Sequence, residues 1–376
     1  RMRMKAPSFL ADPGYVDLTI LFLRTIQLFL DFFLKYTLGY TTLFGWNKEA
    51  KRADLDGEDS AQIVTILWGS RFPPFHNKLS RFLYLHDRYI KATGVLAFDN
   101  VQLSRINDKY AIFAVLPKDV DSYDTSRYPF MYYCHMAEPR KFVLMSHSAL
   151  IRLGKSCESY LDDPGKKLFF LPNIGRCGST LLCQMFSRLP QTLVLSEPYA
   201  TATATELLNR DIISETEFKA LVLAAWKVQL KVHRAPRFNF SRIFVKPTLF
   251  STNSIEILRR AFPAVRVAIL SRHPRTVVSS FVRCFNHFTK TSPLWARKER
   301  NAWMFQLTAG PPDGCHQALQ RGYSPAQLQA LSIAEVCAHS YALTTSMLLR
   351  LLTNGCADHV FLYEVGMKIP AYHTLF

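Results

Sequence analysis

A glycine-containing loop flanked by hydroxyl side chains is the part of the sequence best suited to chemistry. Residues 167–182 read as an apolar strand, a loop, and then the start of a helix. Gly175 and Gly178 allow a tight turn that brings backbone N–H groups toward an anion, while Ser179 and Thr180 add hydroxyl donors at the positive helix end. The stretch predicts a cradle for a phosphate-like anion. An ordinary strand-to-helix turn with a serine cap is the alternative.

The loop differs from the one that binds nucleoside triphosphates. That loop needs Lys directly after its second glycine, but Ser179 follows Gly178 here, and Asn173 occupies the earlier glycine position. The cation of this loop is instead Arg176, two residues before Gly178.

A second stretch, 261–281, also ends a strand with a cation. The strand is expected to end at Arg272, and Pro274 lies near the first turn of the helix that follows. Ser280 falls in the early turns of that helix, so a guanidinium and a hydroxyl could bind one phosphate together. The alternative is a capped helix with a surface arginine.

Together the two stretches resemble the sulfotransferase family. Residues 176–182 (RCGSTLL) are similar to the 5′-phosphosulfate loop of carbohydrate-type and related members. Arg272 and Ser280 have the eight-residue spacing of the family's 3′-phosphate motif, although His273 replaces the usual Asp. The similarity covers about residues 166–365 and ends in a Tyr-Glu pair at Glu364. The Gly-x-x-Gly-x-Trp loop of many members is not found in this sequence.

The resemblance implies a three-layer P-loop α/β/α fold. It also implies transfer of a sulfuryl group from 3′-phosphoadenosine 5′-phosphosulfate (PAPS) to a hydroxyl acceptor, with a carbohydrate as one candidate. No metal is expected to take part. The resemblance implies that Arg272 and Ser280 hold the 3′-phosphate. Arg176 would also stabilise charge on the oxygen that bridges phosphorus and sulfur. The residues expected at the 5′-phosphate are Gly175, Arg176, Cys177, Gly178, Ser179 and Thr180.

Two further side chains follow predicted strands. Glu197, in a Ser-Glu-Pro run, is the candidate base for the acceptor hydroxyl, with a salt bridge or a helix cap as the alternative. Lys246, in a Lys-Pro run, resembles a family segment near the sulfate or the acceptor. The alternative for Lys246 is an exposed cation at a strand end.

Two rival functions stay open at this point. A P-loop kinase would need a lysine in the loop, which is missing, and a metal-binding carboxylate at a strand end. A catalytically inactive nucleotide-binding or membrane-associated scaffold would keep the fold without the transfer reaction.

The elements that must position these residues alternate between strand and helix, which predicts a parallel central sheet with helices on both faces. Ligands of such sheets bind beyond the carboxyl ends of the strands. The predicted strands are 167–171, 192–195, 243–245, 265–270 and 359–363. The predicted helices are 179–187, 215–233, 254–262, 274–288 and 333–352.

The sequence before residue 160 has a different pattern. Short β-type runs at 62–68, 111–116, 130–133 and 142–145 predict a small mixed region of unknown role. We therefore expect an N-terminal helical segment over 1–47, the mixed region over 61–160, and the sulfotransferase-like domain over 166–376.

The charge distribution agrees with an anion site in the last of these regions. The chain has 376 residues and a formal net charge of +17, and residues 151–376 carry 27 basic and 14 acidic side chains. No motif of a nucleic-acid-binding protein is present, so a nucleic-acid partner is not expected. A hydrophobic content of 49% excludes disorder of the whole chain. The basic cluster at 297–300 is interpreted as a solvated face or as a contact to cofactor or acceptor.

The apolar stretch 16–46 carries a narrow polar stripe, in which Asp17, Arg24 and Asp31 repeat every seven residues. A membrane-associated helix and a helix buried by the protein are both compatible with this pattern. The location therefore stays open between the Golgi or another membrane and the cytoplasm. The sequence begins with Arg1, so its start is expected to be missing or processed.

Overall fold

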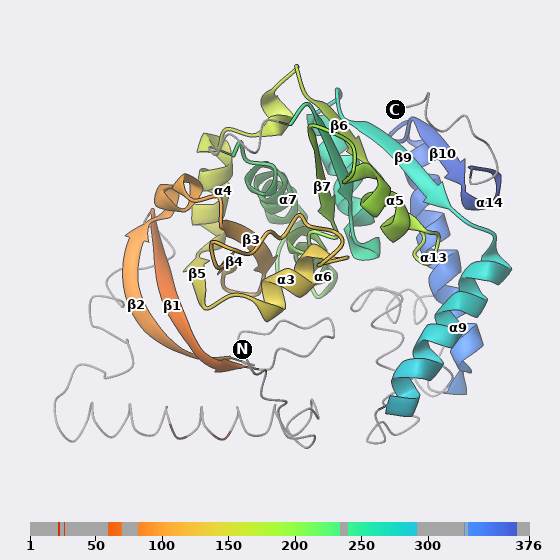
Figure 1. The fold of residues 1–376 in the computed structure, drawn as a ribbon, viewed down its shortest axis with the longest axis horizontal. Helices are drawn as coiled ribbons and strands as arrows, with labels where there is room; N and C mark the ends of the chain where they lie inside the picture. The colour runs from red at the N-terminus through yellow and green to blue at the C-terminus, as the bar shows by residue number, and fades with distance from the viewer. Residues whose placement is uncertain are drawn as a thin grey trace. The chain divides into compact units, whose positions relative to one another are not determined.

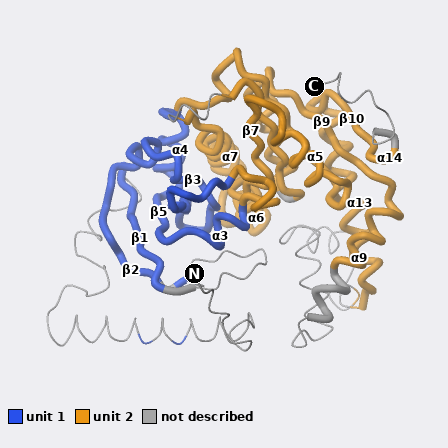
Figure 2. Tube along the Cα trace, in the orientation of Figure 1, with its two compact units in different colours: residues 1–122, 132–157 blue, residues 123–131, 158–376 orange. Residues whose placement is uncertain are grey.

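The computed structural model describes residues 59–69, 82–233, 240–291 and 330–366, together with the single positions 22, 26 and 327. The chain divides into two units (Figure 2): residues 1–122 and 132–157 form the first, and residues 123–131 and 158–376 form the second. Apart from positions 22 and 26, the apolar stretch 16–46 lies outside the described residues, as does the basic cluster 297–300. None of the described helices is both long and apolar enough to cross a membrane.

The first unit is built on an antiparallel sheet of five strands, in the order β2-β1-β5-β4-β3. Three of these strands coincide with the predicted runs 62–68, 111–116 and 142–145. One face of the sheet carries an apolar cluster that includes Val64, Ile112 and Phe142. The strands are β1 (Ser60–Gly69), β2 (Phe82–Lys91), β3 (Val101–Ile106), β4 (Ala111–Val115) and β5 (Lys141–Met145).

The predicted strand at 130–133 is wrong. Residues there begin the helix α3 (Met131–Ala137), which buries Met131, Cys134 and His135. A short apolar run does not distinguish a strand from a buried helical turn, because nearly every position is apolar in both. Two other helical segments of this unit are η3 (Ala92–Ala97) and α4 (His147–Ser156), whose first turn is capped by the Ser146 hydroxyl.

Arg105 is an unusual member of β3, because its side chain is buried in apolar surroundings. It is only 3% exposed, and its guanidinium lies 5.9 Å from the centre of the Phe142 ring. None of its three guanidinium nitrogens has a hydrogen-bond partner. Burial lowers the pKa of Arg105 to about 9, because the charged form loses its hydration.

The second unit contains the predicted parallel sheet, in the order β10-β9-β6-β8-β7, flanked by helices (Figure 1). All five strands predicted after residue 166 are present, with ends that differ by a residue or two. The strands are β6 (Lys167–Phe170), β7 (Thr192–Ser196), β8 (Arg242–Lys246), β9 (Arg266–Ser271) and β10 (His359–Leu362).

The five helices predicted for this unit are also present, and α6 (Ala200–Asn209) was not predicted. Ser214 caps one of these helices, and Ser332 with Glu335 forms a capping box at another, which explains why both begin where they do. The predicted helices are α5 (Ser179–Phe186), α7 (Glu215–Gln229), α8 (Thr252–Ala261), α9 (Pro274–Thr291) and α13 (Ile333–Thr353).

The central strand β6 determines where a ligand could bind. Phe170 at its end pairs with Val245 of β8 on one side and with Val267 of β9 on the other. The chain leaves β6 for β7 beyond β8, and later crosses to β9 on the opposite side. Ligands of open parallel sheets bind at the strand ends where the order reverses in this way.

Aromatic packing holds α5 against the sheet. The Phe186 ring of α5 stacks on Phe244 of β8 at 4.1 Å between centroids, and Phe169 of β6 stacks on Phe244 at 4.9 Å. Buried Cys183 belongs to the same core cluster. Because one end of α5 is anchored in this way, its first residue, Ser179, stands next to the end of β6.

Candidate functional site

The loop between β6 and α5 has the tight conformation that its glycines predict. Gly175 and Gly178 have φ angles of 69° and 84°, and Arg176 between them has φ of 50°. A side chain at Gly178 would collide with the Tyr363 ring, since a Cβ atom built there lies 2.3 Å from Cε2 of the ring. Gly178 is therefore required by its backbone angle and by its neighbour. It is the N-cap of α5, so the first turn of that helix has no capping side chain.

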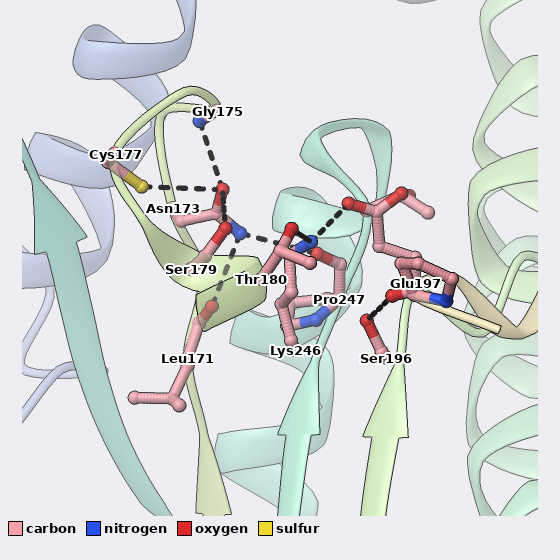
Figure 3. A network of polar contacts seen from close by, with 12 residues as sticks. Leu171, Asn173, Gly175, Cys177, Ser179, Thr180, Ser196, Glu197, Lys246 and Pro247 are labelled. Carbon is pink, nitrogen blue, oxygen red and sulfur yellow. Dashed lines mark hydrogen bonds and ion pairs between the residues drawn. The ribbon is translucent and has the colours of Figure 1, made fainter. Parts of the chain in front are cut away.

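Asn173 organises the inside of this loop and was not predicted as a site residue. Its side chain is 3% exposed, and its Oδ1 accepts hydrogen bonds from Gly175 N at 2.9 Å and from Ser179 Oγ at 3.3 Å (Figure 3). Its Nδ2 donates to the carbonyls of Leu171 and Pro247 at 3.4 and 3.5 Å. Asparagine side chains commonly accept a hydrogen bond from the backbone N–H two residues ahead. This tendency could have identified Asn173 from the sequence.

The predicted loop residues divide by the direction of their side chains. Cys177 and Ser179 are buried and turn toward Asn173, so they face the fold. Burial raises the pKa of the Cys177 thiol, which makes it a poor nucleophile. Arg176 is exposed, and the Thr180 hydroxyl faces Lys246. Only the last two can offer side chains to an outside ligand.

The second predicted motif meets the first. Arg272 directly follows β9, and Ser280 lies in α9. Arg176 Nε donates to Ser280 Oγ at 3.0 Å, and Arg272 Nη1 donates to the carbonyl of Arg176 at 3.1 Å. Residues 96 to 104 positions apart in the chain are thus joined by direct hydrogen bonds. The structure places two arginines and the N-terminal turns of two helices at neighbouring strand ends.

The turn after β10 contacts the same region. The first residues of the short helix α14 (Tyr363–Gly366) are the Tyr-Glu pair of the sequence. Glu364 accepts a hydrogen bond from His273 N, at 3.1 and 3.2 Å to its two oxygens, and lies 3.5 Å from Arg272 Nε. Burial alone would raise the pKa of Glu364, but backbone N–H donors and the Arg272 charge hold it below its ordinary value.

Lys246 and Glu197 form an ion pair at the ends of β8 and β7. Lys246 Nζ is 2.5 Å from Glu197 Oε1 and 3.4 Å from Thr180 Oγ1 (Figure 3). The Lys246 side chain is 2% exposed and the Glu197 side chain 21%, so the alternative considered for Lys246, an exposed cation at a strand end, is wrong. The ammonium also lies 4.6 Å from the centre of the Phe130 ring. The salt bridge considered as the alternative for Glu197 is therefore present.

Glu197 has a constrained backbone. Its φ is 54°, a value that non-glycine residues rarely adopt, and its N–H donates to the carbonyl of Lys246 at 2.7 Å. The neighbouring Ser196 hydroxyl donates to the carbonyl of Pro129. This geometry fixes the carboxylate beside the ammonium. Strained conformations of this kind are common at functional sites.

Comparison with known proteins does not place the chain in a family. No family profile matches the sequence, and no curated protein matches it. Four chains of solved structures match, and among them is a sulfotransferase from Alicyclobacillus acidocaldarius. That likeness covers 55% of this chain and 76% of the other, with 16% identity and a TM-score of 0.28. At these values it says nothing about function, which must be argued from the site itself.

The site offers charge and hydrogen bonds. Within the part of the chain that the structure describes, no group of three or more His, Cys, Asp or Glu side chains could hold a metal ion. The positive groups are Arg176, Arg272 and Lys246, together with the N-terminus of α5. Such an arrangement can bind a polyanion and can stabilise negative charge that develops on an oxygen.

Proposed function

We propose that this chain transfers a sulfuryl group from PAPS to a hydroxyl acceptor, with a carbohydrate as the first candidate. One observation carries the proposal: the loop after β6 and the turn after β9 are joined by the Arg176–Ser280 and Arg272–Arg176 hydrogen bonds. Two anion-binding turns in direct contact suit a nucleotide with phosphates at both its 5′ and its 3′ positions. A nucleoside triphosphate carries its phosphates in one chain and has no group for the second turn.

The residues present fit such a donor. The 5′-phosphate would lie at the N-terminus of α5, where the positive φ angles of Gly175 and Gly178 shape the loop and where Thr180 offers its hydroxyl. Arg272 and Ser280 would hold the 3′-phosphate. Arg176, the exposed cation of the loop, would stabilise charge on the oxygen released when the bond between sulfur and the bridging oxygen breaks.

Lys246, at the end of β8, places a second cation beside the loop, whose own residues include only Arg176 as a cation. It approaches Thr180 from β8, and its burial means that its position is determined by the fold. In the proposed reaction the acceptor oxygen bonds to sulfur, and the 3′,5′-bisphosphate leaves with the electron pair of the broken bond. The acceptor proton passes to Glu197, whose carboxylate Lys246 holds at this strand end.

The binding experiment compares adenosine 3′,5′-bisphosphate with ATP by calorimetry. We expect tighter binding of the bisphosphate, and Arg272→Ala should weaken it by about 1–3 kcal/mol if the contact is charge-assisted. Arg275→Ala is the matched control, because Arg275 is an exposed arginine three residues further along, on α9. Tighter binding of ATP would refute the proposal, and equal losses in the two variants would contradict the role of Arg272.

The transfer experiment separates the enzyme from the alternatives. Incubation with 35S-labelled PAPS and a panel of carbohydrate, lipid, steroid and tyrosine acceptors should label one class. Bisphosphate binding without transfer would favour an inactive nucleotide-binding scaffold. Because Lys246 supplies a cation beside Thr180, a phosphoryl-transfer reaction is tested in parallel with γ-labelled ATP and magnesium. Transfer of phosphate would favour the P-loop kinase.

A further inference from the structure

The Tyr363–Glu364 pair after β10 contacts both anion-binding turns, yet the proposed reaction gives it no role. Tyr363 lies beside Gly178 of the loop after β6, and Glu364 is bonded to the backbone of His273 after β9. β10 is one of the two edge strands of the described sheet, and it pairs in parallel with β9, with Leu362 opposite Ser271. That register brings the pair to the same strand ends as the two turns.

Glu364 and the loop contact different nitrogens of one guanidinium. The carboxylate forms an ion pair with Nε of Arg272 at 3.5 Å, without a hydrogen bond, while Nη1 of Arg272 donates to the carbonyl of Arg176 at 3.1 Å. The same carboxylate accepts from His273 N, just before the first residue of α9. A negative group there is also favoured by the helix dipole. Glu364 thus ties the side chain of Arg272 to the start of the helix that carries Ser280.

The Tyr363 ring supports the guanidinium from a second direction. The Arg272 Cζ atom lies 4.5 Å from the ring centroid, within the range of a cation–π contact. The same ring lies so close to Gly178 that a Cβ atom there would be 2.3 Å from it. The ring therefore fills the space between the arginine of one turn and the glycine of the other, and restricts the movement of both.

We propose that Tyr363 and Glu364 are positioning residues that hold Arg272 ready for a 3′-phosphate. This inference rests on the proposed function. It adds which residues make the protein prefer nucleotides that carry a 3′-phosphate over those that lack one. Arg272 is a long side chain that would lose much rotamer freedom on binding, and contacts made beforehand reduce that cost. The carboxylate is paired with Nε, so the phosphate is bound through the Nη nitrogens, of which Nη1 also donates to the Arg176 carbonyl.

The test measures the dissociation constants of adenosine 3′,5′-bisphosphate and of adenosine 5′-monophosphate for the full chain. Their ratio reports the contribution of the 3′-phosphate alone. Glu364→Gln should reduce this ratio about 10-fold, an effect at the low end of that seen for residues that orient metal ligands, and should leave monophosphate binding unchanged. Glu215→Gln is the control, because it removes one negative charge from an exposed ion pair with Lys219 on α7.

Each outcome separates this inference from the proposal on which it rests. A wild-type protein without preference for the bisphosphate would refute the proposed function and the inference together. A clear preference that Glu364→Gln leaves unchanged would overturn the inference alone. A ratio that rises would also overturn it, because the carboxylate would then be competing with the phosphate for Arg272. If Glu364→Gln does not fold, Glu364→Asp is tested instead, because it keeps the charge on a shorter side chain. The ratio of the two dissociation constants should then fall by less than about 10-fold. An unchanged ratio for Glu364→Asp would overturn the inference.

Discussion

Replacement of Gly178 by alanine tests how the loop is packed, and its cost has two separable parts. The φ angle of 84° places any other residue in the left-handed region, at about 1–2 kcal/mol. The new Cβ would also lie 2.3 and 2.7 Å from two atoms of the Tyr363 ring, and overpacking of this kind costs about 1–3 kcal/mol. We therefore expect Gly178→Ala to lower the free energy of unfolding by about 3 kcal/mol.

Gly355 isolates the first part of that cost. It also has a positive φ, 65°, but no atom lies within 4 Å of a Cβ built at that position. Gly355→Ala should therefore cost only about 1 kcal/mol. Urea unfolding followed by fluorescence and circular dichroism would measure both variants, since the two probes together reveal whether the two units unfold separately.

The second part depends on the tyrosine ring. In a Tyr363→Ala background the steric part disappears, so Gly178→Ala should cost about 1–2 kcal/mol there, close to the value for Gly355→Ala. The reasoning would be refuted if Gly178→Ala cost the same in both backgrounds. Equal costs would mean that Tyr363 does not lie against the loop glycine in solution, and the positioning role inferred for it would lose its basis.

Four further substitutions follow from buried polar groups. Arg105→Met should raise the free energy of unfolding by about 1–3 kcal/mol at pH 7, because it removes a buried guanidinium without hydrogen bonds. Since folding lowers the pKa of Arg105, the cost of burying its charge is complete below about pH 9 and falls as the pH rises above that value. The extra stability of Arg105→Met should therefore shrink above about pH 9. A variant less stable than the wild type at pH 7 would show that the charge has a partner. Glu197→Gln should lower the free energy of unfolding by about 2 kcal/mol, because it leaves the almost fully buried Lys246 ammonium without its counter-charge. Lys246→Met should lower it by less, because the carboxylate that it leaves is partly exposed. Thermal melts that rank the two variants in reverse would contradict this expectation. Asn173→Ala should cost about 2–3 kcal/mol and weaken bisphosphate binding, because Gly175 N and the Ser179 hydroxyl lose their acceptor; calorimetry showing unchanged affinity would mean that the loop does not need this support.

The parallel sheet was predictable because its strands are short apolar runs separated by helices with clear ends. Ser332 with Glu335 is one such signal, and Pro274 at the first residue of α9 is another. The antiparallel unit was predicted less well. The strand β2 was missed, and most of its described positions are half-buried or exposed. The strand β3 was missed because it buries the polar residues Gln102, Ser104 and Arg105. The run beginning at Phe130 was misread because a short apolar run does not distinguish strand from helix.

The positions of the candidate site residues were predictable where they depend on local spacing. Gly178 and Ser280 belong to motifs that lie within a few residues of a strand end, so their neighbourhood could be inferred. The burial of Lys246 and its pairing with Glu197 depend on the side-by-side arrangement of β7 and β8, which no local pattern specifies. The contact of Tyr363 with Gly178 was missed for the same reason, because it depends on the pairing of β10 with β9.

The central place of β6 also has a consequence for synthesis on the ribosome. The strand is completed at Phe170, but one of its partners, β9, begins only at Arg266. At a translation rate of about 5–20 residues per second, the end of β6 waits about 5–20 s before that partner emerges. During this interval one edge of an apolar strand has no neighbour to pair with, which is the condition under which nascent chains associate wrongly. The yield of folded chain should therefore depend on whether other proteins cover this strand edge until β9 has been made.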